Sequence, residues 1–331
     1  MKRAERPLLW PLVPVYRLGL ALREFELRSG LKPVRRLRWP VISIGNLSTG
    51  GSGKTPLTIT LARAIAARGV YVDLLSRGYG RCGKAAARVD SNATVAEFGD
   101  EPLVIAREAG VPVYVAAERY EAGLMAEGAS LQDSQSASQR VGVHLLDDGF
   151  QHRQLARDVD ILLLSRADLH DHLLPAGNLR EALHAAERAD VIAIPADETD
   201  VEAEIRSRGW RAEVWRVRRR MDVPQVDGPV FAFCGIARPG QFFDGLEAAG
   251  ARVAARVAFP DHHNYSARDL ERLASQAQAA GATALLTTEK DRVRLGANAA
   301  SLPIKTVTLR IEVEDEAVIV DWLLRCAAVQ G

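Results

Sequence analysis

The sequence contains few of the residues that mark disulfide-stapled, metal-clustered or strongly charged proteins. Among its 331 residues there are only three cysteines, Cys82, Cys234 and Cys326, which lie far apart and form no CxxC pair. This spacing indicates neither a zinc knuckle nor a disulfide scaffold, and free thiols in a reducing compartment are expected. The formal net charge is only +1, from 43 Lys and Arg against 42 Asp and Glu. A generally basic nucleic-acid binder is therefore not expected.

A long uninterrupted hydrophobic run is also lacking. The most apolar N-terminal stretch, "LLWPLVPVYRLGLAL" (8–22), is interrupted by Pro11, Pro14 and Arg17. It is too short and too broken for a confident transmembrane helix, which needs about 20 apolar residues, and no small-residue cleavage site marks a signal peptide. Two interpretations stay open for this stretch: a helix that packs on the core, or an interfacial helix whose Trp, Tyr and flanking arginines suit an anionic membrane surface.

Apolar runs alternate with helical patterns along most of the chain. The runs lie at 39–45, 70–76, 111–116, 141–148, 158–165 and 190–196, and continuous apolar strands separated by helices predict a parallel sheet covered on both faces. A charged, Pro- and Gly-containing stretch at 218–229 predicts a hinge, after which similar runs predict a second, smaller α/β unit. The expected domains are an N-terminal helix in 1–30, a nucleotide-binding domain in 31–220 and a smaller α/β domain in 221–331. The Ser/Gln-rich stretch at 130–140 is expected to be a solvated loop.

The stretch "SIGNLSTGGSGKTP" (43–56) predicts a phosphate-binding loop between a strand and a helix. The usual P-loop is Gly, four residues and Gly-Lys-Ser/Thr; here Ser48 replaces the leading glycine, and Gly50 and Gly51 supply the backbone freedom. Successive N–H groups and the helix N-terminus would face the phosphates, Lys54 would reach the β- and γ-phosphates, and Thr55 would bind Mg²⁺. The predicted nucleotide-binding residues are Ser48, Thr49, Gly50, Gly51, Ser52, Gly53, Lys54 and Thr55.

Two carboxylates end a predicted neighbouring strand. "VGVHLLDDGFQH" (141–152) runs into Asp147 and Asp148, and the carboxyl edge of such a strand is where a P-loop protein places its Mg²⁺ partner. An acidic turn that only ends the strand is the alternative. The P-loop upstream favours the metal site.

The phosphate acceptor is not defined by a P-loop. GTPases read guanine with an Asn-Lys-x-Asp element, and "TTEKD" (287–291) does not match it, which favours ATP. Two further polar clusters could take part in catalysis: "FGDEP" with Asp100, and "FPDHHNY" with Asp261 and His262. Taken separately, a helix N-cap for Asp100 and an ordinary loop position for His262 explain them equally simply.

Taken together, a series of motifs in order resembles the tetraacyldisaccharide 4'-kinase family of lipid A biosynthesis. The resemblance extends from about residue 10 to residue 295. The motifs are "GNLSTGGSGKTP", "LLSRGYGR", "FGDEP", "LLDDGFQHRQLARDVDILLL", "LLPAGNLREAL", "FCGIARPGQFFDGL", "FPDHHNYS" and "TTEKD". This series is far more specific than the P-loop alone.

The resemblance implies an Mg²⁺-dependent kinase that moves the γ-phosphoryl group of ATP to the 4'-hydroxyl of a tetraacylated disaccharide 1-phosphate, which gives lipid IVA. The family's acid/base pair would correspond to Asp100 and His262. Its acidic metal or nucleotide positions would correspond to Asp147, Asp148 and Glu181, in addition to Thr55. The residues implied to line the site or to contact substrate are Arg77, Gln151, His152 and Asp261.

A lipid acceptor also implies work at a membrane surface, and this favours the interfacial interpretation of the N-terminal stretch. The expected location is the cytoplasmic face of the inner membrane of a Gram-negative bacterium, as a peripheral or monotopic protein, with no protein partner and no nucleic acid. Two other functions stay open. A P-loop NTPase of the switch or delivery type, such as a metallochaperone-like GTPase, would need a Cys or His cluster for its metal. His170 and His172 could form a metal site, but no cysteine joins them, which favours a solvated loop. A soluble small-molecule kinase would simply pack its N-terminal stretch on the core.

Overall fold

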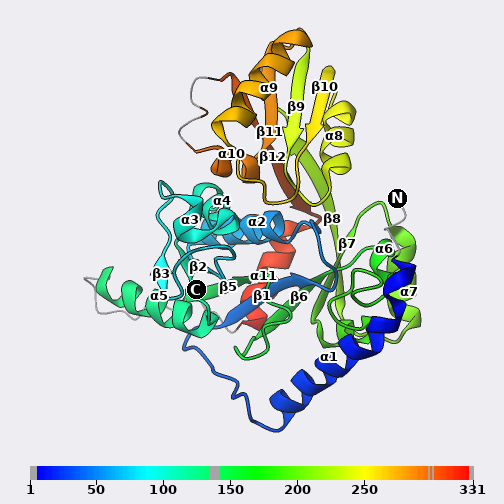
Figure 1. Cartoon of the computed structure of the whole chain (residues 1–331). Coiled ribbons are helices and arrows are strands. Elements are labelled where there is room, and N and C mark those ends of the chain that lie inside the picture. Colours follow the sequence, from blue (N-terminus) through cyan, green and yellow to red (C-terminus); the bar gives the residue numbers. More distant parts are fainter. Residues whose placement is uncertain (1–5, 134–141, 297–298, 300–301, 328–331) are drawn as a thin grey trace.

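The computed structural model describes residues 6–133, 142–296, 299 and 302–327 and has the α/β architecture expected from the sequence. Within these residues one mixed, mostly parallel sheet has the strand order β10-β9-β11-β12-β8-β7-β6-β1-β5-β2-β4-β3. Figure 1 shows that the strands fall into a larger lower unit and a smaller upper unit. The prediction of a P-loop-like parallel sheet with a second, smaller α/β unit and an N-terminal helix is confirmed.

The larger unit is built around parallel strands that are buried on both faces. Helices α2, α4 and α11 cover one face, and α5 and α7 pack on the other. The strands are β1 (Val41–Asn46), β2 (Tyr71–Ser76), β4 (Val113–Val115), β5 (Gly142–Asp147), β6 (Val159–Leu163) and β7 (Val191–Pro195), with the short edge strand β3 (Ala87–Arg88). The helices are α2 (Lys54–Ala67), α3 (Val95–Phe98), α4 (Asp100–Glu108), α5 (Arg119–Asp133), α6 (Arg166–Leu169), η2 (Leu183–Arg188), α7 (Thr199–Ser207) and α11 (Glu316–Cys326).

The central position of β1 places the predicted phosphate loop beside the predicted metal site. Strand β1 pairs in parallel with β5 and with β6, and Ile44 lies opposite Asp147 at the end of β5. Since parallel strands end at the same edge of a sheet, the loop after β1 and the two carboxylates at the end of β5 emerge side by side.

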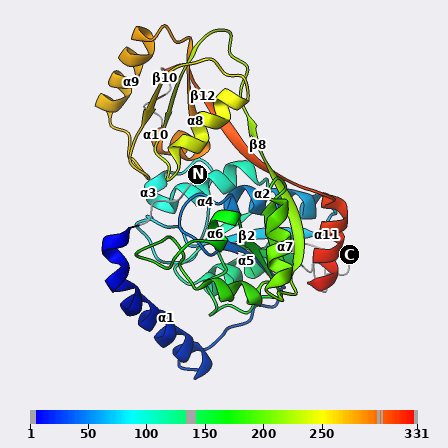
Figure 2. The ribbon, with the colours of Figure 1, turned by 90° about the vertical axis from the view of Figure 1, so that its right-hand side faces the viewer.

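The smaller unit repeats this construction on a smaller scale. Its parallel strands are β10 (Val253–Ala258), β9 (Val230–Cys234) and β11 (Ala284–Thr288), and its helices are α8 (Pro239–Ala248), α9 (Ala267–Ala279) and α10 (Glu289–Leu295). The two units are joined by a ribbon of two long antiparallel strands, β8 (Glu213–Asp222) and β12 (Ile304–Val313), as Figures 1 and 2 show.

The predicted domain boundaries at residues 30 and 220 stay a prediction. Within the range 221–331, the last described helix packs on the larger unit and not on the smaller one. Helix α11 returns to the larger unit, where Ile319, Val320 and Leu323 join the core cluster that contains Leu57 of α2. The chain therefore enters the smaller unit through β8 and leaves it through β12. The solvated loop expected at 130–140 is wrong for residues 130–133, which belong to α5; residues 134–140 lie outside the described part.

The N-terminal stretch forms η1 (Pro7–Leu12) followed by α1 (Val13–Arg28), which lies along the outside of the larger unit (Figures 1 and 2). One side of it packs on the larger unit through Val13, Tyr16 and Leu20. Seven of its other apolar side chains are exposed: Leu8, Trp10, Leu12, Val15, Leu18, Leu22 and Phe25. Among the described helices none combines the length and apolar character needed to cross a membrane.

A buried ionic network ties α5 to the sheet. The imidazole of His144 on β5 lies 2.8 Å from a carboxylate oxygen of Asp73 on β2 and 3.4 Å from one of Glu127 on α5, and the side chains of His144 and Asp73 are fully buried. Burial by itself would lower the pKa of His144, but the two carboxylates outweigh it and raise the pKa to about 9.

This network predicts a loss of stability in mild alkali. A histidine with a folded-state pKa of about 9 and an ordinary unfolded value of 6.5 stabilises the fold fully below pH 6.5 and loses that contribution as the pH rises through 9. We expect the free energy of unfolding to fall by about 3 kcal/mol between these limits, measured by urea denaturation. The double variant Asp73→Asn/His144→Gln serves as the control, and an equal slope in it would contradict the prediction.

Candidate active site

The phosphate loop follows β1 and ends where α2 begins at Lys54. Gly50 and Gly53 have φ angles of +94° and +96°, the left-handed region that favours glycine, so the loop needs glycine at both positions. The N–H of Thr49 donates to Asn178 O at 2.8 Å, which anchors the start of the loop. Ser48, at the position of the usual leading glycine, is buried and its carbonyl accepts a 2.7 Å hydrogen bond from the side chain of Asn46.

A cleft of about 1220 Å³ lies between the two units at this loop. Its lining combines residues that are distant in sequence: all of 48–55, Tyr79, Glu101, Asp148, Arg180, Asp261, His262 and Lys290. The cleft therefore brings the predicted phosphate loop and the "FPDHHNY" cluster to opposite walls of one space.

The two carboxylates after β5 differ in environment. Asp147 is buried, and its carboxylate accepts from Thr55 Oγ1 at 3.4 Å and from Thr58 Oγ1 at 3.2 Å. Burial, Glu101 and the neighbouring carboxylate raise the pKa of Asp147 to about 7. Asp148 instead faces Lys54 Nζ at 3.5 Å and Arg180 at 2.8 Å, and its φ angle of +51° is uncommon for a residue other than glycine.

The charges around Asp148 keep it ionised. Burial acts to raise its pKa, but Lys54 and Arg180 outweigh burial and hold the pKa well below the usual range. Asp148 therefore positions Lys54 at the mouth of the loop. The Thr55 hydroxyl and the Asp147 carboxylate form the pair of oxygen donors that fits Mg²⁺, which uses one or two carboxylates and takes its remaining ligands from water and phosphate.

Glu181 lies apart from this pair. Its carboxylate forms a 2.7 Å ion pair with Arg188, which stacks on Phe150, and Glu181 does not line the cleft. Across the described residues, no group of three or more His, Cys, Asp and Glu side chains could hold a metal ion by itself. A metal role for Glu181 stays a prediction without a contact that supports it.

Asp100 and His262, which are 162 residues apart in sequence, meet at the cleft. The Nδ1 atom of His262 lies 3.0 Å from a carboxylate oxygen of Asp100, the first residue of α4. Asp100 is only 4% exposed, whereas the His262 side chain is 45% exposed to the cleft. His262 also has a left-handed φ of 59°, and backbone conformations of this kind gather at functional sites.

A buried arginine holds Asp100 from behind. Arg294 of α10, whose side chain is 1% exposed, donates to Asp100 through Nε at 2.9 Å and through Nη2, and to Gly235 O at 2.6 Å. Burial acts to raise the pKa of Asp100, but Arg294 and Lys290 outweigh it, so the pKa is lowered. Asp100 is thus a fixed anion that orients His262. The carboxylate of Asp261, which precedes His262 in the sequence, accepts a hydrogen bond from the backbone N–H of His262 at 3.0 Å.

The remaining predicted residues lie on the side of the loop that faces α1. The side-chain amide of Gln151 donates to Asn46 O at 3.0 Å, and the backbone carbonyl of Gln151 accepts from Arg23 of α1 at 2.6 Å. Burial and the positive charges of Arg119, Arg157, Arg23 and Arg77 together lower the pKa of His152 to about 3. Arg23, Arg77, Arg119 and Arg157, whose charges act on His152, are called the basic cluster here; Arg157 also forms an ion pair with Asp160 at 2.8 Å.

Comparison with known proteins agrees with the motif series. The family model described as "Tetraacyldisaccharide-1-P 4'-kinase" matches residues 5–328. The chain belongs to this family. The tetraacyldisaccharide 4'-kinase of Koribacter versatilis is 40% identical over 95% of this chain and 97% of its own, and that of Neisseria meningitidis is 34% identical over 87% and 82%. The structure of LpxK from Aquifex aeolicus, an "apo" form in complex with ATP, has a TM-score of 0.74 at 30% identity and covers 96% of this chain and 98% of its own.

Membership of the tetraacyldisaccharide 4'-kinase family confirms the predictions of a kinase, of ATP as the donor and of a role in lipid A biosynthesis. It overturns both alternatives, the metallochaperone-like GTPase and the soluble small-molecule kinase of another class. The two histidines considered for a metal have other neighbours: His172 packs on the ring of Trp10, with ring centroids 4.7 Å apart, and Nε2 of His170 lies 3.9 Å from Glu204.

Sequence reasoning missed several residues of this kinase site. Arg180 fixes Asp148, Arg294 fixes Asp100, and Lys290 pairs with Glu101 at 2.6 Å. Arg180 and Lys290 lie inside motifs that carried the resemblance, "LLPAGNLREAL" and "TTEKD", so the motifs pointed to the right segments. Arg294 follows Asp291 by one helical turn, a spacing that indicates a shared helix face but no partner.

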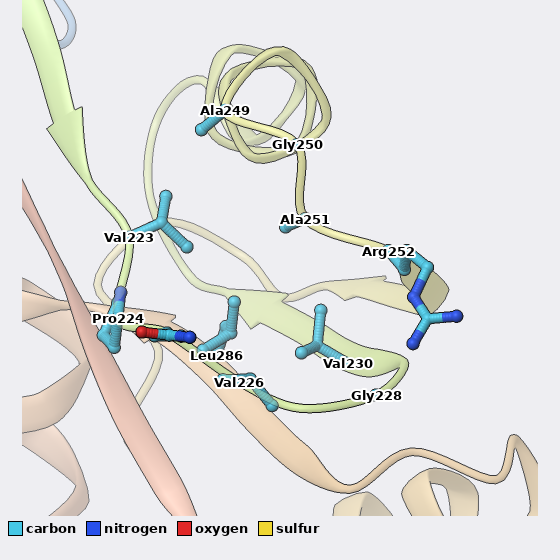
Figure 3. Close-up of a pocket in the computed structure, with 11 residues that line it drawn as sticks. Val223, Pro224, Val226, Gly228, Val230, Ala249, Gly250, Ala251, Arg252 and Leu286 are labelled. Carbon is cyan, nitrogen blue, oxygen red and sulfur yellow. The ribbon is translucent and has the colours of Figure 1, made fainter.

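A second, smaller cavity of about 240 Å³ lies within the smaller unit, beside the end of α8 (Figure 3). Val223, Val230 and Leu286 lie on its inside and Arg252 at its edge. None of the predicted site residues lines it.

Proposed function

We propose that this kinase transfers the γ-phosphoryl group of ATP to the 4'-hydroxyl of a tetraacylated glucosamine disaccharide 1-phosphate at a membrane surface. The observation that carries the proposal is the Asp100–His262 pair, whose histidine lines the same cleft as the phosphate loop. A phosphoryl donor held by residues 48–55 and a proton acceptor on the opposite wall are the two parts that transfer to a hydroxyl requires.

His262 is the proposed proton acceptor and Asp100 its positioning residue. With the proton on Nδ1, His262 donates to Asp100, and Nε2 is then free to accept the proton of the sugar hydroxyl. Asp100 itself is a weak base, because Arg294 and Lys290 lower its pKa. The carboxylate instead fixes the imidazole orientation and stabilises the imidazolium that forms.

The donor side is proposed to act by charge neutralisation. Lys54 lies between Asp148 and the loop and would meet the β- and γ-phosphates, while Thr55 and Asp147 would hold Mg²⁺. When bound, Mg²⁺ would supply positive charge to the phosphate oxygens. The loop amides and the N-terminus of α2 add fixed partial charges.

The basic cluster around His152 is proposed to receive the anionic head of the lipid acceptor. Arg119 is 8% exposed, and its Nε is a buried donor without a hydrogen-bond partner among the described residues. A buried donor of this kind costs free energy unless a ligand satisfies it. Arg23 of the cluster lies on α1, so the acceptor would extend from the membrane-facing helix to the cleft.

Helix α1 is proposed as the membrane contact, on the cytoplasmic face of the inner membrane. Val15, Leu18, Leu22 and Phe25 are each more than half exposed and recur at helical spacing, so they form one apolar stripe. Exposed apolar side chains beside arginines are typical of an interfacial helix on anionic lipid.

Replacing Leu18, Leu22 and Phe25 together with serine should release the protein from vesicles that contain anionic lipid. Full burial of one large apolar side chain in lipid would contribute on the order of 1.5–3 kcal/mol to the binding free energy, and each serine removes that contribution. Because all three are exposed in the fold, the unfolding temperature should not change. Vesicle co-sedimentation measures the effect, and unchanged binding of the folded triple variant would assign the contact to another surface.

The proposed function is tested with γ-labelled ATP and the acylated disaccharide 1-phosphate in mixed micelles. We expect label on the lipid, and none when the acceptor lacks its 4'-hydroxyl. Label that appears only in inorganic phosphate, or on the 4'-deoxy acceptor, would overturn the assignment of the acceptor group.

A further inference from the structure

Arg219, on the ribbon strand that joins the two units, contacts the phosphate loop directly. Its Nη2 atom donates to Ser52 O at 2.6 Å and lies 3.5 Å from Gly51 O, while Nη1 donates to Gln241 Oε1 of α8 at 3.2 Å. One side chain thus joins β8, the loop and the first helix of the smaller unit.

The geometry of the peptide bond gives this contact a direction. In a trans peptide the C=O and the following N–H point in opposite directions. Because the carbonyls of Gly51 and Ser52 face Arg219, the N–H groups of Ser52 and Gly53 point away from it. Arg219 therefore fixes the orientation of two successive amides of the loop and leaves their donor side free.

The positive charge of Arg219 acts through the same peptides. A cation that bonds to a carbonyl polarises the amide, so its N–H becomes a stronger donor to an anion on the far side. In the described residues, the hydrogen bonds of Arg219 go to neutral oxygens of Ser52, Gly51 and Gln241, and no ion pair involves it. Among the described residues, no carboxylate in contact with Arg219 neutralises its positive charge.

The neighbours of Arg219 on β8 behave differently. Arg218 and Arg220 also line the cleft, but side chains alternate along a strand, so the two leave β8 on its other face. Arg218 pairs with Glu314 at 2.8 Å, and Arg220 pairs with Glu312 at 3.1 Å. The contact with the loop is thus specific to position 219 and is not a general property of this basic strand.

We propose that Arg219 is a positioning residue for nucleotide binding, which orients and polarises the loop amides that receive the β-phosphate of ATP or ADP. The proposal rests on residues 48–55 being the nucleotide site of the proposed function. Since the β-phosphate is common to both nucleotides, Arg219 acts on ATP and ADP alike, and it acts on binding more than on the transfer step.

The test is the dissociation constant of Mg-ATP and of Mg-ADP for the full-length protein, measured calorimetrically without acceptor. Arg219→Ala is expected to weaken both nucleotides about tenfold, the size of one charge-assisted hydrogen bond. Arg219→Lys, which keeps the charge with a single donor group, should recover part of the loss. Arg216→Ala, which removes an arginine of the same strand that does not line the cleft and pairs with Glu202, should bind as the parent does.

Kinetics separate positioning from a merely structural role. KM for ATP should rise with the dissociation constant in Arg219→Ala, whereas kcat at saturating ATP should change less than threefold, and the unfolding temperature without nucleotide should stay parental. Arg219→Gln, a neutral side chain of similar length, replaces the alanine variant if that variant does not fold. Dissociation constants within twofold of the parent in the folded neutral variant would overturn the proposal.

The variant Lys54→Ala tests separately whether residues 48–55 bind the nucleotide and whether Arg219 positions them. If Lys54→Ala binds Mg-ATP as tightly as the parent, the loop is not the nucleotide site and the proposed function fails first. If Lys54→Ala loses affinity and Arg219→Ala does not, only the role of Arg219 is overturned.

Discussion

Asp100→Asn and His262→Ala should each lower kcat by roughly 10²–10⁴-fold, the range for loss of a general base or of its correct orientation. Asparagine keeps the shape of Asp100 but removes its negative charge. Because His262 Nδ1 and the Arg294 guanidinium face the same oxygen of Asp100, the asparagine carbonyl would take that place and leave only a neutral acceptor for the imidazolium that forms. Alanine at position 100 is a poorer test, because it also removes the oxygen that accepts hydrogen bonds from Nε and Nη2 of the buried Arg294.

The effects of these two substitutions on kcat should not be additive in free energy. If Asp100 acts through His262, the double variant Asp100→Asn/His262→Ala should be little worse than the poorer single variant, at saturating ATP and acceptor. ATP affinity should survive in all three, since neither residue belongs to the loop. His170→Ala, at an exposed histidine outside the cleft, is the control. Fully multiplicative losses would show independent roles and refute the positioning role of Asp100.

Lys54→Ala should lower kcat/KM for ATP by at least roughly 10²–10³-fold, because it removes a preorganised positive charge from the site where charge moves in the transition state. The fold should persist, since Asp148 keeps its two hydrogen bonds from Arg180 at 2.8 and 3.0 Å. The unfolding temperature and the steady-state rate are the two measurements.

A lysine elsewhere provides the comparison for this prediction. Lys84 is exposed and does not line the cleft, so Lys84→Ala should retain the parental rate. Parental turnover by a correctly folded Lys54→Ala protein would exclude the loop as the ATP site.

The sequence could predict what is local. The phosphate loop combines a strand, glycines, Lys54, Thr55 and a helix within about 25 residues, and each of these features is a short-range property of the chain. The neighbouring position of Asp147 followed from one general rule, that parallel strands end at a common edge. The structure has β1 and β5 paired in the register that this rule requires.

The pairing of Asp100 with His262 could not be derived in this way. The two residues lie 162 positions apart on different units, and no periodicity or spacing relates them. Only the family resemblance placed them together, and it could not supply their partners. That Arg294 makes Asp100 an ion-paired carboxylate rather than a base depends on the packing of α10 against α4, which is a tertiary contact.

Adjacent residues in one motif also proved indistinguishable from sequence. The resemblance pointed to Glu181, whereas the side chain in contact with Asp148 is that of Arg180, one position earlier. Which of two neighbours faces the cleft depends on the local backbone direction, and here Arg180 follows an irregular segment without helix or strand. The charge pattern "NLREAL" gives no signal for it.

The return of α11 to the larger unit has a consequence for how the chain folds as it is synthesised. Strand β1 and helix α2 leave the ribosome early, yet the core around Leu57 is incomplete until Ile319, Val320 and Leu323 have followed. The apolar strands of the smaller unit, made in between, can pair before that moment. The nucleotide loop is thus among the first segments to emerge, and α11, which completes the core beneath α2, is the last helix described.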